Sequence, residues 1–231
     1  MKIAFVCLAA LVLPIIMSSA IHAADNRDWA QFNRYAEANA ALNSNPDVVF
    51  MGNSITDFWP GKSPEFWADN AGFVGRGISG QTTCEMLVRF RQDVINLHPR
   101  VVVILAGIND IARNNGKISL VNVLGNLKSM TELARAHGIK VALCSVVPCS
   151  RFPWRPEIKP AMLVKHLNGM IEQYVAGLAS DEVVYVDYYT PMANAEGGLD
   201  ADLADDGCHP TPKGYAIMER VVLEALAQWS K

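Results

Sequence analysis

The 231-residue sequence has no run of basic residues, and its formal net charge is only −3. Nothing in that charge balance would attract nucleic acid or an anionic membrane. The sequence also lacks a Cys-x-x-Cys pair and a histidine-rich cluster, so we expect no zinc site. No segment repeats with a period of 20–50 residues, which argues against a repeat protein. These absences leave a single globular domain of ordinary size as the simplest interpretation.

The first two dozen residues differ in character from the rest. A positively charged start precedes the apolar run "IAFVCLAALVLPIIM", and small residues follow in "SSAIHAAD". This pattern is typical of a secretory signal peptide, so we assign residues 1–23 to the signal and 24–231 to one domain. A single anchoring helix is the alternative, but the run is shorter than the about 20 residues of a membrane span. No cysteine ends the run, so we expect no lipid anchor and no stable membrane anchor, and a periplasmic or extracellular location.

Five short runs rich in β-branched residues are mostly continuous rather than alternating, which is typical of strands buried on both faces of a parallel sheet. They are Val48–Met51, Phe73–Val74, Val101–Ala106, Lys140–Val147 and Val183–Val186. Helical patterns lie between them in "TTCEMLVRFRQDVINL", "SLVNVLGNLKSMTELARAHG", the stripe from Leu163 to Leu178 and the stripe from Tyr215 to Trp229. A further helix is predicted from Asn26 to Leu42. Because strands and helices alternate, the predicted class is α/β.

Polar residues follow the predicted strands at the points where ligands bind to open parallel sheets. Ser54 follows the first strand and "GISG" follows the second, while "LAGIND" contains the end of the third. The segment "DDGCHPTPKG" follows the fifth strand and precedes the last helix. We therefore expect these four loops to meet at one rim of the sheet. His98 and His137 precede strands and belong to the opposite rim, so His209 is the histidine expected at the site.

The residue types at this rim suit nucleophilic catalysis. A serine nucleophile needs a base, and the base needs a group that orients it. We predict that Ser54 is the nucleophile, His209 the base and Asp206 the orienting carboxylate. The predicted donors to a developing oxyanion are the backbone N–H of Ser54, the backbone N–H of Gly80 and the side-chain amide of Asn109. Each feature alone is also compatible with an ordinary cap or turn.

Ser79 is the rival nucleophile, although Gln81 stands where a Gly-x-Ser-x-Gly elbow requires its second glycine. Four cysteines lie beyond the predicted signal, and buried free thiols are one interpretation of them. The alternatives are a disulfide between Cys84 and Cys208, which are close in sequence to Gly80 and His209, and a competing disulfide between Cys144 and Cys149.

These segments resemble the SGNH hydrolases, also called the GDSL-like lipase/acylhydrolase family. The matching blocks are "GNSIT" with Ser54, "GISG" with Gly80, "GIND" with Gly107 and Asn109, and "DGCH" with Asp206 and His209. They occur in the family's order across nearly the whole predicted domain. The resemblance implies a flavodoxin-like three-layer α/β/α sandwich with a five-stranded parallel sheet, and ester hydrolysis through an acyl-enzyme without a metal or cofactor. Asn53 departs from the family's aspartate, which is not a triad member.

The amino-acid sequence of the first two blocks is similar to that of one branch of the family. This branch contains platelet-activating-factor-acetylhydrolase-like esterases and bacterial carbohydrate acetylesterases. We therefore expect an exported serine esterase that removes small acyl groups, especially acetyl groups from a small-molecule or carbohydrate ester. Trp59 and Trp154 are candidates to pack against a sugar, with ordinary packing as the alternative for each. The functional alternatives are a lysophospholipase or thioesterase that accepts longer chains, and a carbohydrate-binding relative without catalysis.

Overall fold

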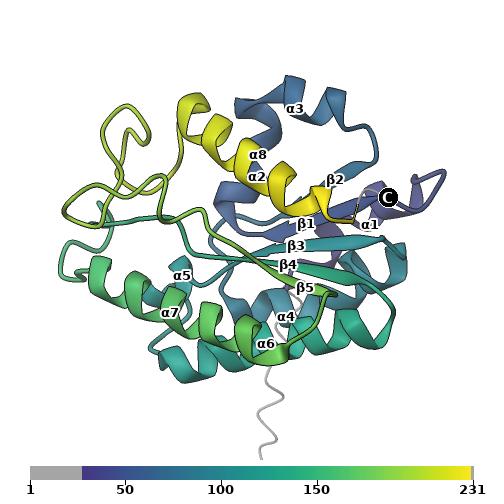
Figure 1. Cartoon of the computed structure of the whole chain (residues 1–231), viewed down its shortest axis with the longest axis horizontal. Helices are drawn as coiled ribbons and strands as arrows, with labels where there is room; N and C mark the ends of the chain where they lie inside the picture. Colours follow the sequence, from purple (N-terminus) through teal and green to yellow (C-terminus); the bar gives the residue numbers. More distant parts are fainter. Residues whose placement is uncertain (1–27, 230–231) are drawn as a thin grey trace, which may run out of the picture.

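The computed structural model describes residues 28–229, so the predicted signal segment lies outside the described residues. Five parallel strands form one sheet in the order β2-β1-β3-β4-β5. Helices cover both faces of this sheet (Figure 1), which confirms the three-layer α/β/α prediction. The strand bounds are β1 Val48–Gly52, β2 Phe73–Gly77, β3 Val101–Leu105, β4 Lys140–Cys144 and β5 Val183–Val186.

The strands are apolar throughout because neighbouring residues of one strand face two different cores. In β1, Val49 and Met51 belong to one core, whereas Val48 and Phe50 belong to the other. Such continuous apolar strands are expected when helices cover both faces of a parallel sheet. The five predicted strands are therefore confirmed, with ends shifted by a few residues.

Different helices cover the two faces of the sheet. One core is covered by α4 (Thr83–Asp93), α6 (Leu120–Ala136) and α7 (Ala161–Leu178), and the other by α2 (Ser54–Lys62), α3 (Pro64–Asp69) and α8 (Pro212–Ala227). The capping box predicted at the start of α4 is present, with Thr82 and Glu85 as its two members. Four predicted helices are thus confirmed, while α2, α3 and the short α5 (Ile108–Ile111) were not predicted.

The predicted helix from Asn26 to Leu42 is wrong. The described part of this segment holds a short 3-10 helix, η1 (Phe32–Arg34), and one short α-helix, α1 (Ala36–Ala40), neither of which has a buried residue. Gln31 has a left-handed backbone with φ of 58°, which interrupts helical geometry before η1. A short helix gains most of its stability from an apolar face packed on a core, and this segment offers no such face.

The register of the sheet aligns the strand ends that carry the polar loops. Gly52 of β1 pairs with Gly77 of β2 and with Leu105 of β3. The chain therefore leaves these three strands at the same level, and α5 and the long loop before α8 also lie beyond this left-hand edge of the sheet in Figure 1. The carboxyl ends of the strands therefore form the rim at which the sequence predicts the site.

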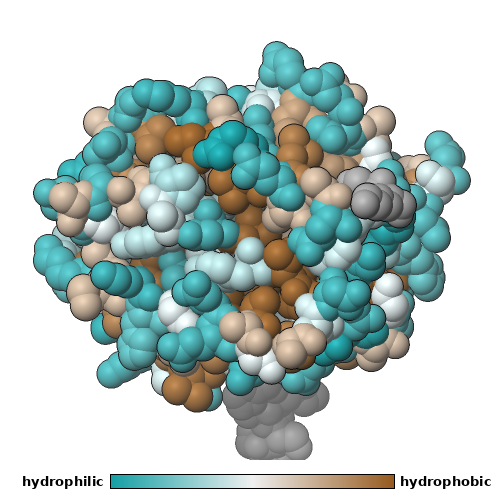
Figure 2. All heavy atoms as spheres, viewed as in Figure 1, coloured by the Kyte–Doolittle hydropathy of each residue, from teal (hydrophilic) through white to brown (hydrophobic). Residues whose placement is uncertain are grey.

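The molecular surface is a mosaic of hydrophilic residues with smaller apolar patches between them on the face shown in Figure 2. Within residues 28–229, no helix combines the length and the apolar character that crossing a membrane requires. The same residues contain no group of three or more His, Cys, Asp or Glu side chains arranged to hold a metal ion.

Candidate active site

Small residues allow the loops at the rim to approach one another. A Cβ atom on Gly77 would lie 2.2 Å from the backbone nitrogen of Asp57, and one on Gly52 would lie 2.0 Å from Thr56 Oγ1. Side chains at these strand ends would therefore push α2 away from β2. The glycines are thus part of what places Ser54 at the rim.

Ser54 is the first residue of α2 and is almost completely buried. Asn53 precedes it as the N-cap, and its Oδ1 accepts a hydrogen bond from the backbone N–H of Ile55 at 3.2 Å. Asparagine can therefore cap this helix in place of the aspartate of the family pattern. The first N–H groups of a helix have no intrahelical acceptor, so the N–H of Ser54 is available to a ligand.

A chain of hydrogen bonds joins Ser54 to His209 and Asp206. Ser54 Oγ lies 2.9 Å from His209 Nε2, and His209 Nδ1 lies 2.6 Å from Asp206 Oδ2. The second carboxylate oxygen of Asp206 accepts the backbone N–H groups of Cys208 at 2.9 Å and of His209 at 2.8 Å. The carboxylate therefore fixes both the backbone and the ring of His209, with Nε2 directed at Ser54.

Two opposing effects act on the pKa of Asp206. Partial burial favours the neutral acid, but hydrogen bonds from the His209 ring and from the N–H groups of His209 and Cys208 outweigh it, so the pKa lies below its usual value. The carboxylate is therefore ionised at neutral pH and can stabilise a positive charge on the imidazole.

The predicted oxyanion donors lie around the same serine. Gly80 has a φ of 83°, a left-handed conformation that suits glycine, and its carbonyl accepts a hydrogen bond from Asn114 Nδ2 at 3.2 Å. Asn109 is buried in α5, and its Nδ2 donates to the carbonyl of Gln81 at 2.9 Å. This bond leaves the second proton of the Asn109 amide for another acceptor.

These groups line one cavity of about 250 Å³, bounded by Ser54, Phe58, Ser79, Gly80, Asn109, Asn114, Trp154 and His209. Two aromatic rings flank the imidazole of His209. The ring centroid of Phe58 lies 5.4 Å from it, and the ring of Trp154 stacks at 6.1 Å with an interplanar angle of 30°. Trp154 is 42% exposed, so its face is available to a ligand.

Phe58 and Asn114 were missed by the sequence analysis. Phe58 follows Ser54 by four residues on α2, so the two lie on the same face of that helix. Recognising this short helix would have pointed to Phe58. Asn114 lies in the turn after α5, where the sequence contains no comparable signal.

The prediction that Trp59 binds substrate is wrong. Trp59 is 1% exposed and packs in the core against the rings of Phe50, Phe66 and Tyr215. Its Nε1 donates to Glu219 at 3.0 Å, which satisfies the indole inside the core. The ring therefore anchors α2 from beneath and cannot contact a ligand at the rim.

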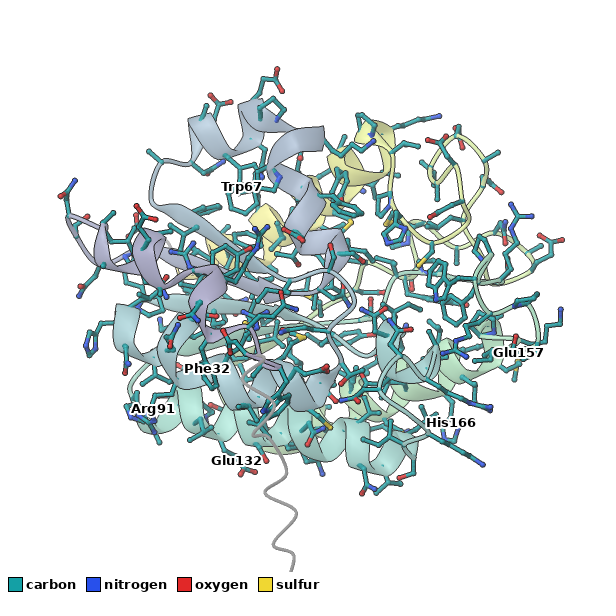
Figure 3. All side chains as sticks on the ribbon, turned by 180° about the vertical axis from the view of Figure 1, so that it is seen from behind. Phe32, Trp67, Arg91, Glu132, Glu157 and His166 are labelled. Carbon is teal, nitrogen blue, oxygen red and sulfur yellow. The ribbon has the colours of Figure 1, made fainter. Side chains whose placement is uncertain are left out.

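Ser79 lies at the cavity but has a different partner. Its hydroxyl donates to Asp57 Oδ2 at 2.6 Å, and its N–H donates to the same oxygen at 3.1 Å. Ser79 thus holds the second loop against α2, whereas Ser54 is the serine hydrogen-bonded to a histidine. His98 precedes β3, His137 precedes β4, and His166 lies on the exposed side of α7 (Figure 3).

A buried arginine connects several loops of the rim. Arg89 Nη2 donates to the carbonyls of Gly52 at 3.1 Å and Arg76 at 3.0 Å, and Nε donates to Gln81 Oε1 at 2.5 Å. Its remaining bond joins Nη1 to Asp93 at 2.9 Å. One guanidinium therefore ties the residues just before Ser54 to the residue just after Gly80.

All four described cysteines are free thiols, as in the first of the three interpretations, although Cys84 is exposed rather than buried. Neither of the two alternative disulfides is formed. Cys84 is exposed, and its sulfur accepts a hydrogen bond from Asn126 Nδ2 at 3.3 Å. The side chain that contacts Cys208 is that of Cys149. The alternative pairing of Cys84 with Cys208 does not fit these contacts, because Cys84 is exposed beside Asn126 of α6 whereas Cys208 is buried beside Cys149.

A cavity of similar size lies at the opposite end of the sheet. It measures about 270 Å³ and is lined by Asp47, Arg100 and Trp229, among others. Its lining contains neither a serine nor a histidine, whereas the hydrogen-bonded Ser54 and His209 both line the smaller cavity at the rim.

Comparisons with known proteins agree with this fold. Residues 50–217 match the model of the GDSL-like lipase/acylhydrolase family. The chain is 46% identical to a GDSL-like lipase from Bacteroides thetaiotaomicron, over 87% of this chain and 98% of that one, with a TM-score of 0.81.

Two further similarities are weaker. The uncharacterized lipoprotein YqeF of Bacillus subtilis is 30% identical, over 74% of this chain and 86% of its own length. An acetylxylan esterase from Geobacillus stearothermophilus shares the fold with a TM-score of 0.61 at 21% identity, over 82% of this chain and 96% of that one.

A family match that spans most of the described residues, together with relatives of this similarity, identifies the chain. It belongs to the GDSL-like lipase/acylhydrolase family, and it is a serine hydrolase that acts on ester bonds.

Proposed function

We propose that this protein is an exported serine esterase that removes small acyl groups, in particular acetyl groups from carbohydrate, through an acyl-enzyme. The observation that carries the proposal is the hydrogen-bonded chain from Ser54 Oγ through His209 to Asp206. In this chain each group has the neighbour that nucleophilic catalysis requires.

In the proposed acylation step, Ser54 Oγ attacks the ester carbonyl while His209 Nε2 takes the hydroxyl proton. Asp206 stabilises the imidazolium through Nδ1. Hydrogen bonds from the N–H of Ser54, the N–H of Gly80 and the amide of Asn109 stabilise the negative charge that develops on the carbonyl oxygen. The imidazolium then protonates the leaving alcohol as the bond from carbon to the alcohol oxygen breaks.

In the proposed deacylation step, the same histidine activates a water molecule. His209 takes a proton from the water, and the resulting hydroxide attacks the acyl carbon attached to Ser54. The bond between that carbon and Oγ breaks, the acid leaves, and the proton returns to the serine. The same three donors stabilise this second tetrahedral intermediate.

The preference for a small acyl group rests on the size and orientation of the cavity. The leaving oxygen must lie within hydrogen-bonding distance of His209 Nε2, so the alcohol extends over the imidazole between Phe58 and Trp154. The acyl group is then directed toward Gly80 and Asn114. The whole cavity measures about 250 Å³, which leaves little space for a long chain on that side.

The alcohol side has more space and a mixed polar and aromatic lining. A second cavity of about 230 Å³ adjoins the first at Phe58 and His209, and Lys62 and Asp205 also line it. Aromatic faces next to charged hydrogen-bonding groups suit an alcohol that carries several hydroxyls. The acetylxylan esterase of the same fold acts, by its name, on an ester of this chemical class.

Export is supported by the N-terminal pattern of a charge, an apolar run and small residues. The relative from Bacillus subtilis bears the name of a lipoprotein, which is also a class of exported protein. We therefore propose a periplasmic or extracellular enzyme, released after cleavage near residue 23.

Labelling with a fluorophosphonate probe tests the nucleophile. We expect the adduct on Ser54, no labelling and no turnover in Ser54→Ala, and an unchanged labelling site in the matched control Ser79→Ala. An adduct on Ser79 would overturn the assignment. An intact, folded protein that takes no label and hydrolyses no ester would instead favour the carbohydrate-binding alternative.

Substrate class is tested with p-nitrophenyl esters from acetate to palmitate and with acetylated oligosaccharides. We expect kcat/KM to be highest for acetate and to fall as the acyl chain lengthens. The apolar rings of Phe58 and Trp154 are the feature that favours the lysophospholipase or thioesterase alternative. A maximum at long chains would establish that alternative.

A further inference from the structure

Two buried thiols meet beneath the loop that carries the histidine. Cys149 lies in the loop after β4, and Cys208 lies between Asp206 and His209. Both side chains are buried and belong to the same core. The side chain of Cys149 lies close enough to that of Cys208 to act on its thiol, although the residues are far apart in the sequence.

The loops around these thiols also contact each other. The thiol of Cys149 donates to the carbonyl of Arg151 at 3.2 Å. The side chain of Arg151 in turn packs on Gly207, where an added Cβ atom would lie 3.1 Å from Nε. Contact between the loops thus continues from Cys149 to Gly207, the residue before Cys208.

We propose that Cys149 and Cys208 are a disulfide site, and that the bond fastens the histidine loop to the loop after β4 when the protein folds in an oxidising compartment. The inference concerns the cysteines alone and does not depend on the ester that is hydrolysed. The natural setting for the bond depends on the export proposed above, because disulfides persist in oxidising compartments.

The oxidant is a disulfide of the thiol–disulfide exchange class, such as oxidised glutathione. One cysteine, as the thiolate, attacks the glutathione disulfide, forming a mixed disulfide and releasing one glutathione thiol. The second thiolate attacks the protein sulfur of that mixed disulfide, which forms the Cys149–Cys208 bond and releases the second glutathione. Two protein thiols are oxidised and one glutathione disulfide is reduced to two thiols.

The bond should form during folding rather than afterwards. In the folded protein, the neighbouring Cys149 side chain and burial hold the pKa of Cys208 well above its usual value. Exchange needs an accessible thiolate, and both side chains are shielded from solvent. The same shielding would protect the bond from reduction once the protein has folded.

The bond would affect the active site because both loops contribute to it. The residues between β5 and α8 include Asp206 and His209 but no helix or strand. The loop after β4 carries Trp154, whose ring stacks on His209. A bond between the two loops would therefore hold the base and its aromatic neighbour together.

The test refolds the full-length reduced chain in a glutathione buffer of defined redox ratio. Free thiols are then alkylated in denaturant, and the peptides are mapped without reduction. We expect a linked peptide that contains Cys149 and Cys208, with Cys84 and Cys144 alkylated. We also expect the urea midpoint of the oxidised protein to exceed that of the reduced protein by about 1–2 M.

Two variants complete the test. The control Cys84→Ser should keep the difference in midpoint between oxidised and reduced protein, whereas Cys208→Ser should lose it. Alkylation of both Cys149 and Cys208 after complete refolding, or a link from either of them to Cys7, Cys84 or Cys144, would overturn the proposal. The peptide map needs no esterase activity, so a failure of the proposed function would be seen separately.

Discussion

Replacing Arg89 with methionine should lower the free energy of unfolding by at least about 3–5 kcal/mol. The guanidinium is fully buried and pairs with the buried carboxylate of Asp93 at 2.9 Å. Removing one partner of a buried ion pair leaves the other charge without compensation, which costs about 3–5 kcal/mol. Asn39 Nδ2 still donates to Asp93 at 2.9 Å, so the carboxylate keeps one partner and we do not expect a greater loss from this pair.

The same substitution removes hydrogen bonds from the loops of the active site. Gly52 keeps a bond from the N–H of Ile78 at 3.1 Å, whereas Gln81 Oε1 loses its bond to Nε of Arg89. A buried acceptor without a partner costs about 1–3 kcal/mol. We therefore expect kcat to fall in the folded variant as well, because Gly52, just before Ser54, and Gln81, just after Gly80, lose a shared hydrogen-bonding partner.

The assay is urea unfolding followed by circular dichroism, with kcat on p-nitrophenyl acetate measured in the absence of urea. Arg220→Met is the matched control, because Arg220 forms an exposed pair with Glu224 at 3.2 Å. Exposed pairs contribute about 0–1 kcal/mol. The double variant Arg89→Met/Asp93→Leu should be more stable than Arg89→Met alone, since it leaves no buried unpaired carboxylate.

Two results would refute this reasoning. If Arg89→Met costs no more than Arg220→Met, the buried pair contributes nothing that an exposed pair does not. If the double variant is no more stable than Arg89→Met, the loss does not arise from an uncompensated charge on Asp93.

Three further predictions concern the rim. Asn109→Ala should lower kcat by about 10²–10³ with a smaller change in KM, because its amide is proposed to act mainly in the transition state; an unchanged kcat would remove it from the oxyanion hole. Burial raises the pKa of Asp110 to about 6 despite hydrogen bonds from Thr83. This carboxyl therefore contributes about 3 kcal/mol to the free energy of unfolding below pH 4, and the contribution is lost as the pH rises through about 6. Urea unfolding between pH 4 and 7 should show that loss in the parent protein and a flatter profile in Asp110→Asn, and two parallel profiles would contradict it. Trp154→Ala should lower kcat/KM for acetylated oligosaccharides about two- to tenfold, the equivalent of one lost aromatic contact, with p-nitrophenyl acetate affected less; equal losses on both substrates would mean that the ring does not contact the sugar.

The strands and the main helices could be predicted from the sequence because their signals are local. Runs such as Val101–Ala106 are apolar at every position, which fits a strand between two cores. The capping box at the start of α4 depends only on the four residues from Thr82 to Glu85, so it can be recognised from the local sequence. Loops at the carboxyl ends of parallel strands share one rim of the sheet, and this rule predicted from the sequence that Ser54 and His209 lie close together.

Short elements and the N-terminal segment escaped prediction because their stability depends on distant residues. The nine-residue α2 contains Pro60 and has no strong apolar periodicity, yet it forms because Trp59 is anchored in the core by contacts with α3 and α8. The predicted helix from Asn26 to Leu42 has a suitable composition, but within its described part only the short elements η1 and α1 form, and neither has a buried residue.

The sequence by itself thus determined the order of the strands along the chain, the rim at which polar residues gather, and the residue types available for catalysis. Tertiary structure alone decided which of two tryptophans faces the site and which cysteine meets Cys208. Trp59 and Trp154 are equally aromatic, and burial is a property of the assembled layers rather than of the residue. Cys149 lies 59 positions from Cys208 in the chain, and no local pattern records a contact that depends on how two loops pack against each other.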